Sequence, residues 1–233
     1  MITKELFSAN KIFVKSILFL LAIAFSTTNV FAKGPSHNND PLSLDEVKKT
    51  MSMMSGSKLS ARTIGDVESP VVKNPQEILL IEKNREKGAP SDQRRADVFV
   101  YDYSTDELIQ SLVDLNTSEV LRSERKQGVQ LPLTKNELKR VKEIVFEDEE
   151  ELAILEHEYR RITSRELTDA AELNVKAFTF LAESLPNRVN EASKECGIHR
   201  CAQLMLYTQE NVVFEVSPIV NLSKSVVTQR IGF

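Results

Sequence analysis

Apolar residues recur along this chain at two spacings, one typical of helices and the other typical of strands. Residues 44–54 place apolar side chains on one helical face, and Ser43 with Glu46 supplies a capping signal at its start. A stretch containing glycine and proline follows at 55–75, and residues 78–81 form an apolar run of strand length. The pattern therefore predicts one helix, a connection and one strand.

Three further strand signals follow one another after a charged loop. They occupy residues 98–101, 108–115 and 119–123, and turn-forming residues separate them. Consecutive strands with short turns usually pair side by side, so this region predicts a three-stranded antiparallel meander.

A second helical region begins at a capping box formed by Thr134 and Glu137. Asp148 then falls where the apolar stripe requires an apolar residue, and it resembles the start of another helix. The sequence therefore predicts two consecutive helices, at about 135–147 and 149–160. The acidic residues around Asp148 lack the glycine turn and alternating ligands of a calcium loop, and they suit a helix start.

Two parts of the chain resemble each other. Residues 96–101 match 202–207 and both segments end in tyrosine, while residues 112–116 match 219–223. We interpret this as an internal duplication, with chance similarity between two amphipathic hairpins as the alternative. The duplication assigns residues 173–182 to a strand, although their composition also permits a helix.

These elements predict an α+β fold of two tandem small domains, each with a helix packed on an antiparallel meander sheet, an arrangement that is cystatin-like. The predicted boundaries are a signal peptide at 1–32, a polar lead-in at 33–41, a first α+β unit at 42–132 and a second at 133–233.

The start of the chain has the layout of an export signal. Three lysines lie within residues 1–15, and an apolar run covers 17–25. Val30 and Ala32 take the small-residue positions before a cleavage site between Ala32 and Lys33. An uncleaved membrane anchor is the alternative, but the run is much shorter than the ~20 residues that span a bilayer. We therefore expect a periplasmic or secreted protein that makes no membrane contact after signal removal.

Removal of the signal makes the protein more acidic. The chain has 30 basic and 34 acidic residues, and the signal contains three lysines and one glutamate. Subtraction leaves 27 basic and 33 acidic residues, a net charge of −6. A surface with this balance does not attract nucleic acid, which excludes nucleic acid as a partner.

Cys196 and Cys201 are the only cysteines of the chain. In an oxidising compartment such a pair normally forms a disulfide. A redox or metal site is the alternative, but the four intervening residues fit neither a C-x-x-C motif nor the usual zinc spacing. His199 lies between the cysteines rather than after the second, which also excludes covalent haem attachment on pattern. We therefore predict a structural disulfide.

Residues 94–134 carry a resemblance to a known family. The segments 94–102, 113–115 and 128–134 read Arg-Arg-Ala-Asp-Val-Phe-Val-Tyr-Asp, Val-Asp-Leu and Gly-Val-Gln-Leu-Pro-Leu-Thr. In this order they are similar to the small amino-terminal domains of copper-containing amine oxidases. The resemblance covers roughly residues 42–160. It implies two small α+β domains of the kind that flank the oxidase's catalytic domain.

The chemistry of that family lies in a larger carboxy-terminal domain. There an Asn-Tyr pair supplies the tyrosine that becomes the quinone cofactor, and three histidines, two of them in His-x-His, bind copper. This sequence contains neither motif, and its histidines are His37, His157 and His199. We therefore expect no amine oxidase activity, no catalytic residue, no cofactor and no metal.

Two further groups of polar residues have structural interpretations. His157 has no second histidine three or four positions away on its helix, so we interpret it as a surface residue. Asp102, Asp106 and Asp114 could meet on a hairpin, but turn and rim positions explain them without catalysis.

The sequence therefore predicts an exported, non-catalytic interaction or accessory module. We expect it to bind a protein partner, of which an amine oxidase is one candidate, through a surface such as an open sheet edge. Two alternatives are a small-ligand-binding protein with a pocket between helix and sheet, and a remnant of an amine oxidase that lost its catalytic domain.

Overall fold

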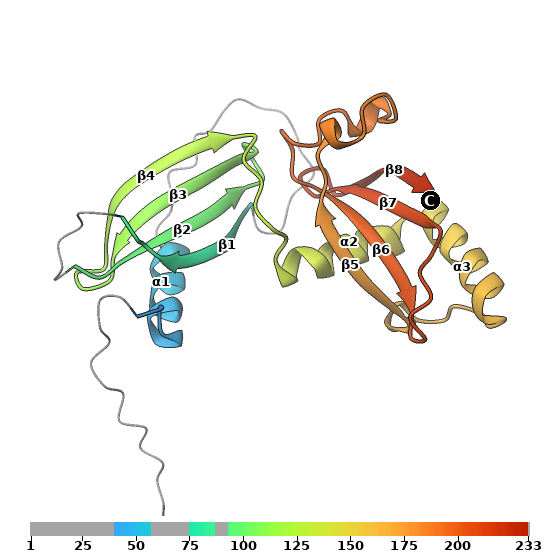
Figure 1. Cartoon of the computed structure of the whole chain (residues 1–233), viewed down its shortest axis with the longest axis horizontal. Helices are drawn as coiled ribbons and strands as arrows, with labels where there is room; N and C mark the ends of the chain where they lie inside the picture. The colour runs from blue at the N-terminus through green and yellow to red at the C-terminus, as the bar shows by residue number, and fades with distance from the viewer. Residues whose placement is uncertain (1–39, 57–74, 87–92, 233) are drawn as a thin grey trace, which may run out of the picture. The chain divides into compact units, whose positions relative to one another are not determined.

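The structure is a computed structural model, and it describes residues 40–56, 75–86 and 93–232 (Figure 1). The predicted signal peptide, its cleavage site and nearly all of the polar lead-in lie outside the described residues.

Two antiparallel four-stranded sheets and three helices make up the described chain, which confirms the predicted α+β class. Sheet A contains β1 Gln76–Lys83, β2 Arg95–Asp102, β3 Glu107–Asp114 and β4 Glu119–Gln127 in chain order. Sheet B contains β5 Leu173–Thr179, β6 Cys201–Thr208, β7 Val216–Asn221 and β8 Val226–Gly232, also in chain order. The helices are α1 Leu44–Gly56, α2 Lys135–Glu147 and α3 Glu149–Thr163, with short 3-10 turns at Ala170–Glu172, Ala182–Ser184 and Glu191–Ser193.

The helices and strands follow the local signals of the sequence. Thr134 and Glu137 form the predicted capping box at the start of α2. The Asp148 side chain accepts the backbone N–H groups of Glu150 and Glu151, which ends α2 and starts α3 as expected. Residues 173–179 form a strand, as the duplication predicted, and a 3-10 turn begins at Ala182.

Buried and less buried residues alternate along β2, and the buried ones form the core between sheet A and α1. Ala96, Val98 and Val100 are buried on one face, where Met54 of α1 packs against them. Figure 1 shows α1 lying along this sheet. On the other face of β2, Tyr101 belongs to a different apolar cluster, and Phe99 packs against that cluster.

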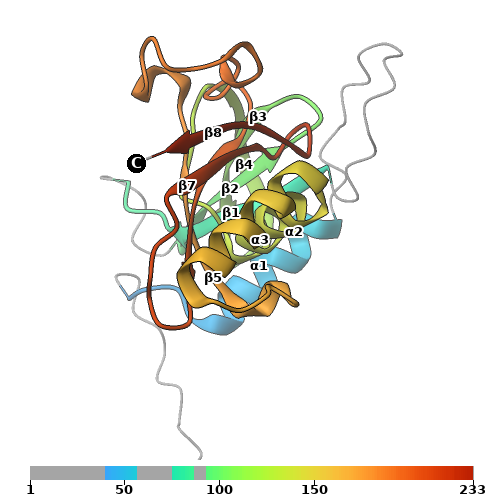
Figure 2. The same cartoon turned by 90° about the vertical axis from the view of Figure 1, so that its right-hand side faces the viewer.

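That second cluster contains residues of both sheets and of α2 and α3. Leu108 of sheet A belongs to it together with Val145 of α2, Leu155 of α3 and Leu204 of sheet B. Figure 2 shows α2 and α3 on one side of β5–β8. The two sheets therefore contribute to one continuous apolar cluster.

The opposite face of sheet B carries a smaller apolar cluster. Phe180, Ile219 and Ile231 pack there with Cys196 and Cys201. The two cysteines form the predicted disulfide, with their Cα atoms 5.4 Å apart and both side chains buried. The bridge holds the loop after β5 against the start of β6.

Glu46 attaches the start of α1 to sheet A. The Ser43 backbone N–H donates to Glu46 Oε2 at 2.7 Å, which completes the predicted capping arrangement. Arg94, which is buried just before β2, donates from Nε and Nη2 to the same carboxylate, the second bond being 3.0 Å long. These Arg94 hydrogen bonds outweigh the opposing effect of burial and lower the pKa of Glu46 from 4.5 to about 2.

We expect Glu46→Gln to destabilise the protein at neutral pH and to lose this effect in acid. A carboxyl whose pKa is lowered on folding stabilises the protein above its unfolded pKa. That contribution disappears as the pH falls from 4.5 towards about 2. Urea unfolding of the wild type and the variant at several pH values measures the difference.

Glu86→Gln is the matched control, because Glu86 is half-exposed and lies 4.0 Å from Arg95. Exposed pairs of this kind contribute about 1 kcal/mol or less, so its unfolding free energy should stay near that of the wild type. A Glu46→Gln effect of the same size at every pH would contradict the role assigned to Glu46.

Candidate functional site

The most completely buried charged group of the described chain is a pair formed by Arg200 and Glu137, both with fully buried side chains. Glu137 lies in the first turn of α2, and Arg200 directly precedes β6. Arg200 Nε donates to Glu137 Oε1 at 2.6 Å, and Nη2 donates to Oε2 at 2.9 Å. This bidentate geometry is the strongest that the two side chains can form.

The remaining donors of Arg200 are satisfied by the segment that joins β4 to α2. Nη1 donates to Gln130 Oε1 at 3.1 Å and to the Leu131 carbonyl at 2.6 Å. Nη2 also donates to the Pro132 carbonyl at 3.1 Å. A buried guanidinium requires partners for all of its N–H groups, and this arrangement supplies them.

Electrostatics favour the charged form of both partners. Burial alone would raise the pKa of Glu137, but the hydrogen bonds and charge of Arg200 outweigh it and lower that pKa. Burial would likewise lower the pKa of Arg200, and Glu137 reverses the effect and raises it. The pair is therefore ionised, and each charge depends on the other.

Tyr103 connects sheet A to this pair. It lies directly after β2, and its hydroxyl donates to Glu137 Oε1 at 2.7 Å. The guanidinium of Arg140 stacks 4.3 Å from the centre of the Tyr103 ring. Burial and the Glu137 carboxylate raise the pKa of Tyr103, so its hydroxyl remains a donor at ordinary pH.

A second polar cluster, the Asp106 cluster, lies beside the pair and consists of Tyr101, Asp106, His199, Asn221 and Ser223. The Tyr101 hydroxyl donates to Asp106 Oδ1 at 3.0 Å, and Ser223 Oγ donates to the same oxygen. His199 Nε2 lies 3.5 Å from Asp106 Oδ2, and Asn221 Nδ2 lies 3.1 Å from His199 Nδ1. Burial, followed by the charge of Asp106, raises the pKa of Tyr101.

The residue types of this cluster are those of a nucleophilic triad, but the geometry is not. In such a triad the serine hydroxyl bonds to a histidine that an aspartate orients. Here Ser223 donates directly to Asp106, and the two nitrogens of His199 face Asp106 and Asn221. Ser223 therefore directs its hydroxyl proton at Asp106 rather than at His199, which differs from the order of contacts in a triad.

Metal chemistry has no ready site among the residues that the structure describes. No three His, Cys, Asp or Glu side chains within 40–56, 75–86 and 93–232 gather as they would around a metal ion. His157 is exposed on α3, as predicted. The structure does not gather Asp102, Asp106 and Asp114, because Asp114 lies at the opposite end of the β2–β3 hairpin from the other two.

Sequence reasoning missed Arg200. Glu137 was identified as a capping residue, and its burial opposite an arginine was not foreseen. The available signal is weak: Arg200 stands between His199 and Cys201, immediately before a strand whose apolar pattern predicts burial. The disulfide loop does come close to both clusters, since Gln130 Nε2 donates to the Gly197 carbonyl at 3.1 Å.

Comparison with known proteins gives a likeness of fold. Neither a scan against protein-family models nor a search of curated proteins finds a match. Among solved structures, the chain is similar to a copper-containing benzylamine oxidase from Hansenula polymorpha, with a TM-score of 0.52 and 12% identity. The alignment covers 85% of this chain and 30% of that chain. This protein therefore has an α+β fold that also occurs in part of a copper amine oxidase.

No helix within the described residues is long and apolar enough to cross a membrane.

Replacement of Arg200 by methionine should destabilise the protein by about 3–5 kcal/mol, because it leaves the Glu137 carboxylate buried without a counter-charge. The double variant Arg200→Met with Glu137→Leu should recover part of this loss, since both buried charges are then absent. Chemical unfolding of the oxidised protein measures each free energy.

Arg165→Met is the matched control, because Arg165 is an exposed arginine that pairs with Glu210 at 3.2 Å. An exposed pair contributes about 1 kcal/mol or less. Equal losses for Arg200→Met and Arg165→Met would show that the buried pair has no special role.

Proposed function

We propose that this protein is an exported, non-catalytic interaction module built like the amino-terminal domains of copper amine oxidases. The observation that carries the proposal is the extent of the structural match. It includes 85% of this chain and only 30% of the oxidase, so this fold occurs there beside a much larger remainder. A module of this kind acts by binding another protein.

The contacts of the described polar side chains support the proposal that these side chains stabilise the fold. The most buried charges, Arg200 and Glu137, satisfy each other, and both nitrogens of His199 face neighbouring groups. The sequence contains neither the Asn-Tyr pair nor the His-x-His motif of the oxidase family. The buried disulfide fits an oxidising compartment, which supports export.

Sheet B offers a surface that suits a protein partner. Its strands alternate, so Phe178, Met205 and Tyr207 lie on the face opposite α2 and α3. The Phe178 side chain is 55% exposed, and Met205 and Tyr207 are partly exposed. Methionine and aromatic residues are enriched in protein interfaces, and these three side chains share one face of the sheet.

Affinity capture tests the proposal. We expect the tagged mature protein to retain one protein in stoichiometric amount from the exported fraction of its native host, and Phe178→Glu to abolish that capture. Leu44→Glu is the matched control, because Leu44 is an equally apolar side chain that is 78% exposed at the start of α1. A blank result from folded, disulfide-bonded wild type would contradict the interaction role.

A direct assay tests the absence of oxidase chemistry. The mature protein is incubated with Cu(II) in air, freed of excess metal and supplied with benzylamine. We expect benzaldehyde formation no faster than with the same amount of free copper, because no described cluster of side chains is arranged to hold the metal. Turnover above that background would show that the protein is an enzyme.

A further inference from the structure

The outer edge of sheet A at β4 is open within the described structure. β4 pairs with β3 on one side, and no backbone hydrogen bond from any other described residue reaches it. Alternate residues of an edge strand direct their N–H and C=O groups away from the sheet. All residues of β4 except Arg125 and Lys126 are exposed.

The other three edge strands are partly occupied or irregular. Asn190 Nδ2 donates to the Thr228 carbonyl of β8 at 2.7 Å, and Lys142 Nζ donates to the Leu173 carbonyl of β5 at 2.7 Å. Both β1 and β4 contain a bulge, but the bulge of β1 leaves residues 80–83 as its regular run, whereas the bulge of β4 at Leu121 leaves the longer run 122–127. β4 therefore offers the most accessible template for a further strand.

The charges of β4 are arranged so that the strand complements itself. Arg122 and Glu124 stand on either side of Ser123, with side chains on the same face. When two copies of β4 run antiparallel about a two-fold axis at Ser123, Arg122 of each copy faces Glu124 of the other. Directly opposed charges of unlike sign stabilise a strand pair.

We propose that β4 pairs antiparallel with β4 of a second copy of this chain, in the register centred on Ser123. The two sheets A would then form one continuous eight-stranded sheet, with α1 of each copy on the same face. The interface is isologous, since the same surface is used by both copies.

Like charges disfavour the neighbouring registers. A two-fold axis perpendicular to the sheet keeps each side chain on its own face, so only registers centred on a residue are allowed. Centring on Arg122 or Arg125 opposes two arginines, and centring on Glu124 opposes two glutamates. The register at Ser123 has no such clash.

Val120 and Leu121, which are 43% and 46% exposed, precede the part of β4 that would pair with the second copy. A bulge places Leu121 outside the ladder with β3, so the regular part of β4 begins at Arg122 and includes the central pairs.

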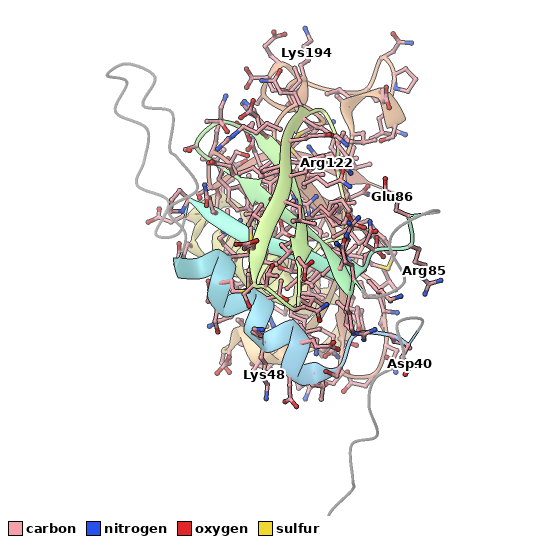
Figure 3. The ribbon with its side chains drawn as sticks, turned by 90° about the vertical axis from the view of Figure 1, so that its left-hand side faces the viewer. Asp40, Lys48, Arg85, Glu86, Arg122 and Lys194 are labelled. Atoms are coloured by element: carbon pink, nitrogen blue, oxygen red, sulfur yellow. A yellow bond between two sulfur atoms is a disulfide. The ribbon has the colours of Figure 1, made fainter. Side chains whose placement is uncertain are left out.

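Charge exchange tests this pairing. Figure 3 labels Arg122 on β4. The side chains of Arg122 and Glu124 are 55% and 53% exposed, so substitutions at these two positions should leave the fold intact. Arg122→Glu or Glu124→Arg alone creates two like-charge pairs and should weaken dimerisation by about tenfold or more. The double exchange Arg122→Glu with Glu124→Arg restores both pairs and should restore the dimer. Sedimentation of the mature protein over a concentration series measures each dissociation constant.

Cross-linking provides a second measurement that does not depend on affinity. In this register the two Ser123 residues face each other across the axis, so Ser123→Cys should form a disulfide-linked dimer under mild oxidation. Val226→Cys is the control, because Val226 is 45% exposed on a different edge strand and should give little dimer.

A monomer at all concentrations, or single and double exchanges with equal effects, would overturn the proposal. Binding of an extended peptide to β4 of a monomer would also overturn it, because the edge would then serve a different partner. The proposal is independent of the partner surface at Phe178, so either can fail while the other holds.

Discussion

The ion pair between Arg200 and Glu137 is the constraint on which the rest of the structure depends. Both side chains are fully buried, so neither charge has water to solvate it, and each is stable only while the other is in place. Tyr103 extends the network to sheet A, and the joining segment 130–132 supplies the remaining acceptors. The apolar cluster around it contains residues of both sheets, so polar and apolar contacts favour the same arrangement.

The regular elements could be predicted from local sequence because their causes are local. The capping box of Thr134 and Glu137 starts α2, Asp148 separates the two helices, and the alternation of β2 defines its buried face. The disulfide was predicted from the expected export and from the spacing of the two cysteines. Even the ambiguous segment 173–179 was assigned to a strand, on its correspondence with an earlier part of the chain.

The buried network could not be predicted because its members are distant in sequence. Arg200 meets Glu137 across 63 positions and Gln130 across 70, and no periodicity links residues so far apart. The Asp106 cluster has the same origin, since Ser223 reaches Asp106 across 117 positions. Asp106 and His199 therefore contact residues that no local sequence pattern would have brought to them.

Native-state hydrogen exchange is the measurement that tests the central claim most directly. If the buried pair and its surrounding cluster hold the chain together, the most protected amides of β2 and β3 should exchange with the same opening free energy as those of β6 and β7. Such agreement would mean that the two sheets unfold as one unit. A clearly lower opening free energy for the sheet A amides than for the sheet B amides would mean that sheet A unfolds while sheet B stays folded, and this result would contradict the central role of the ion pair.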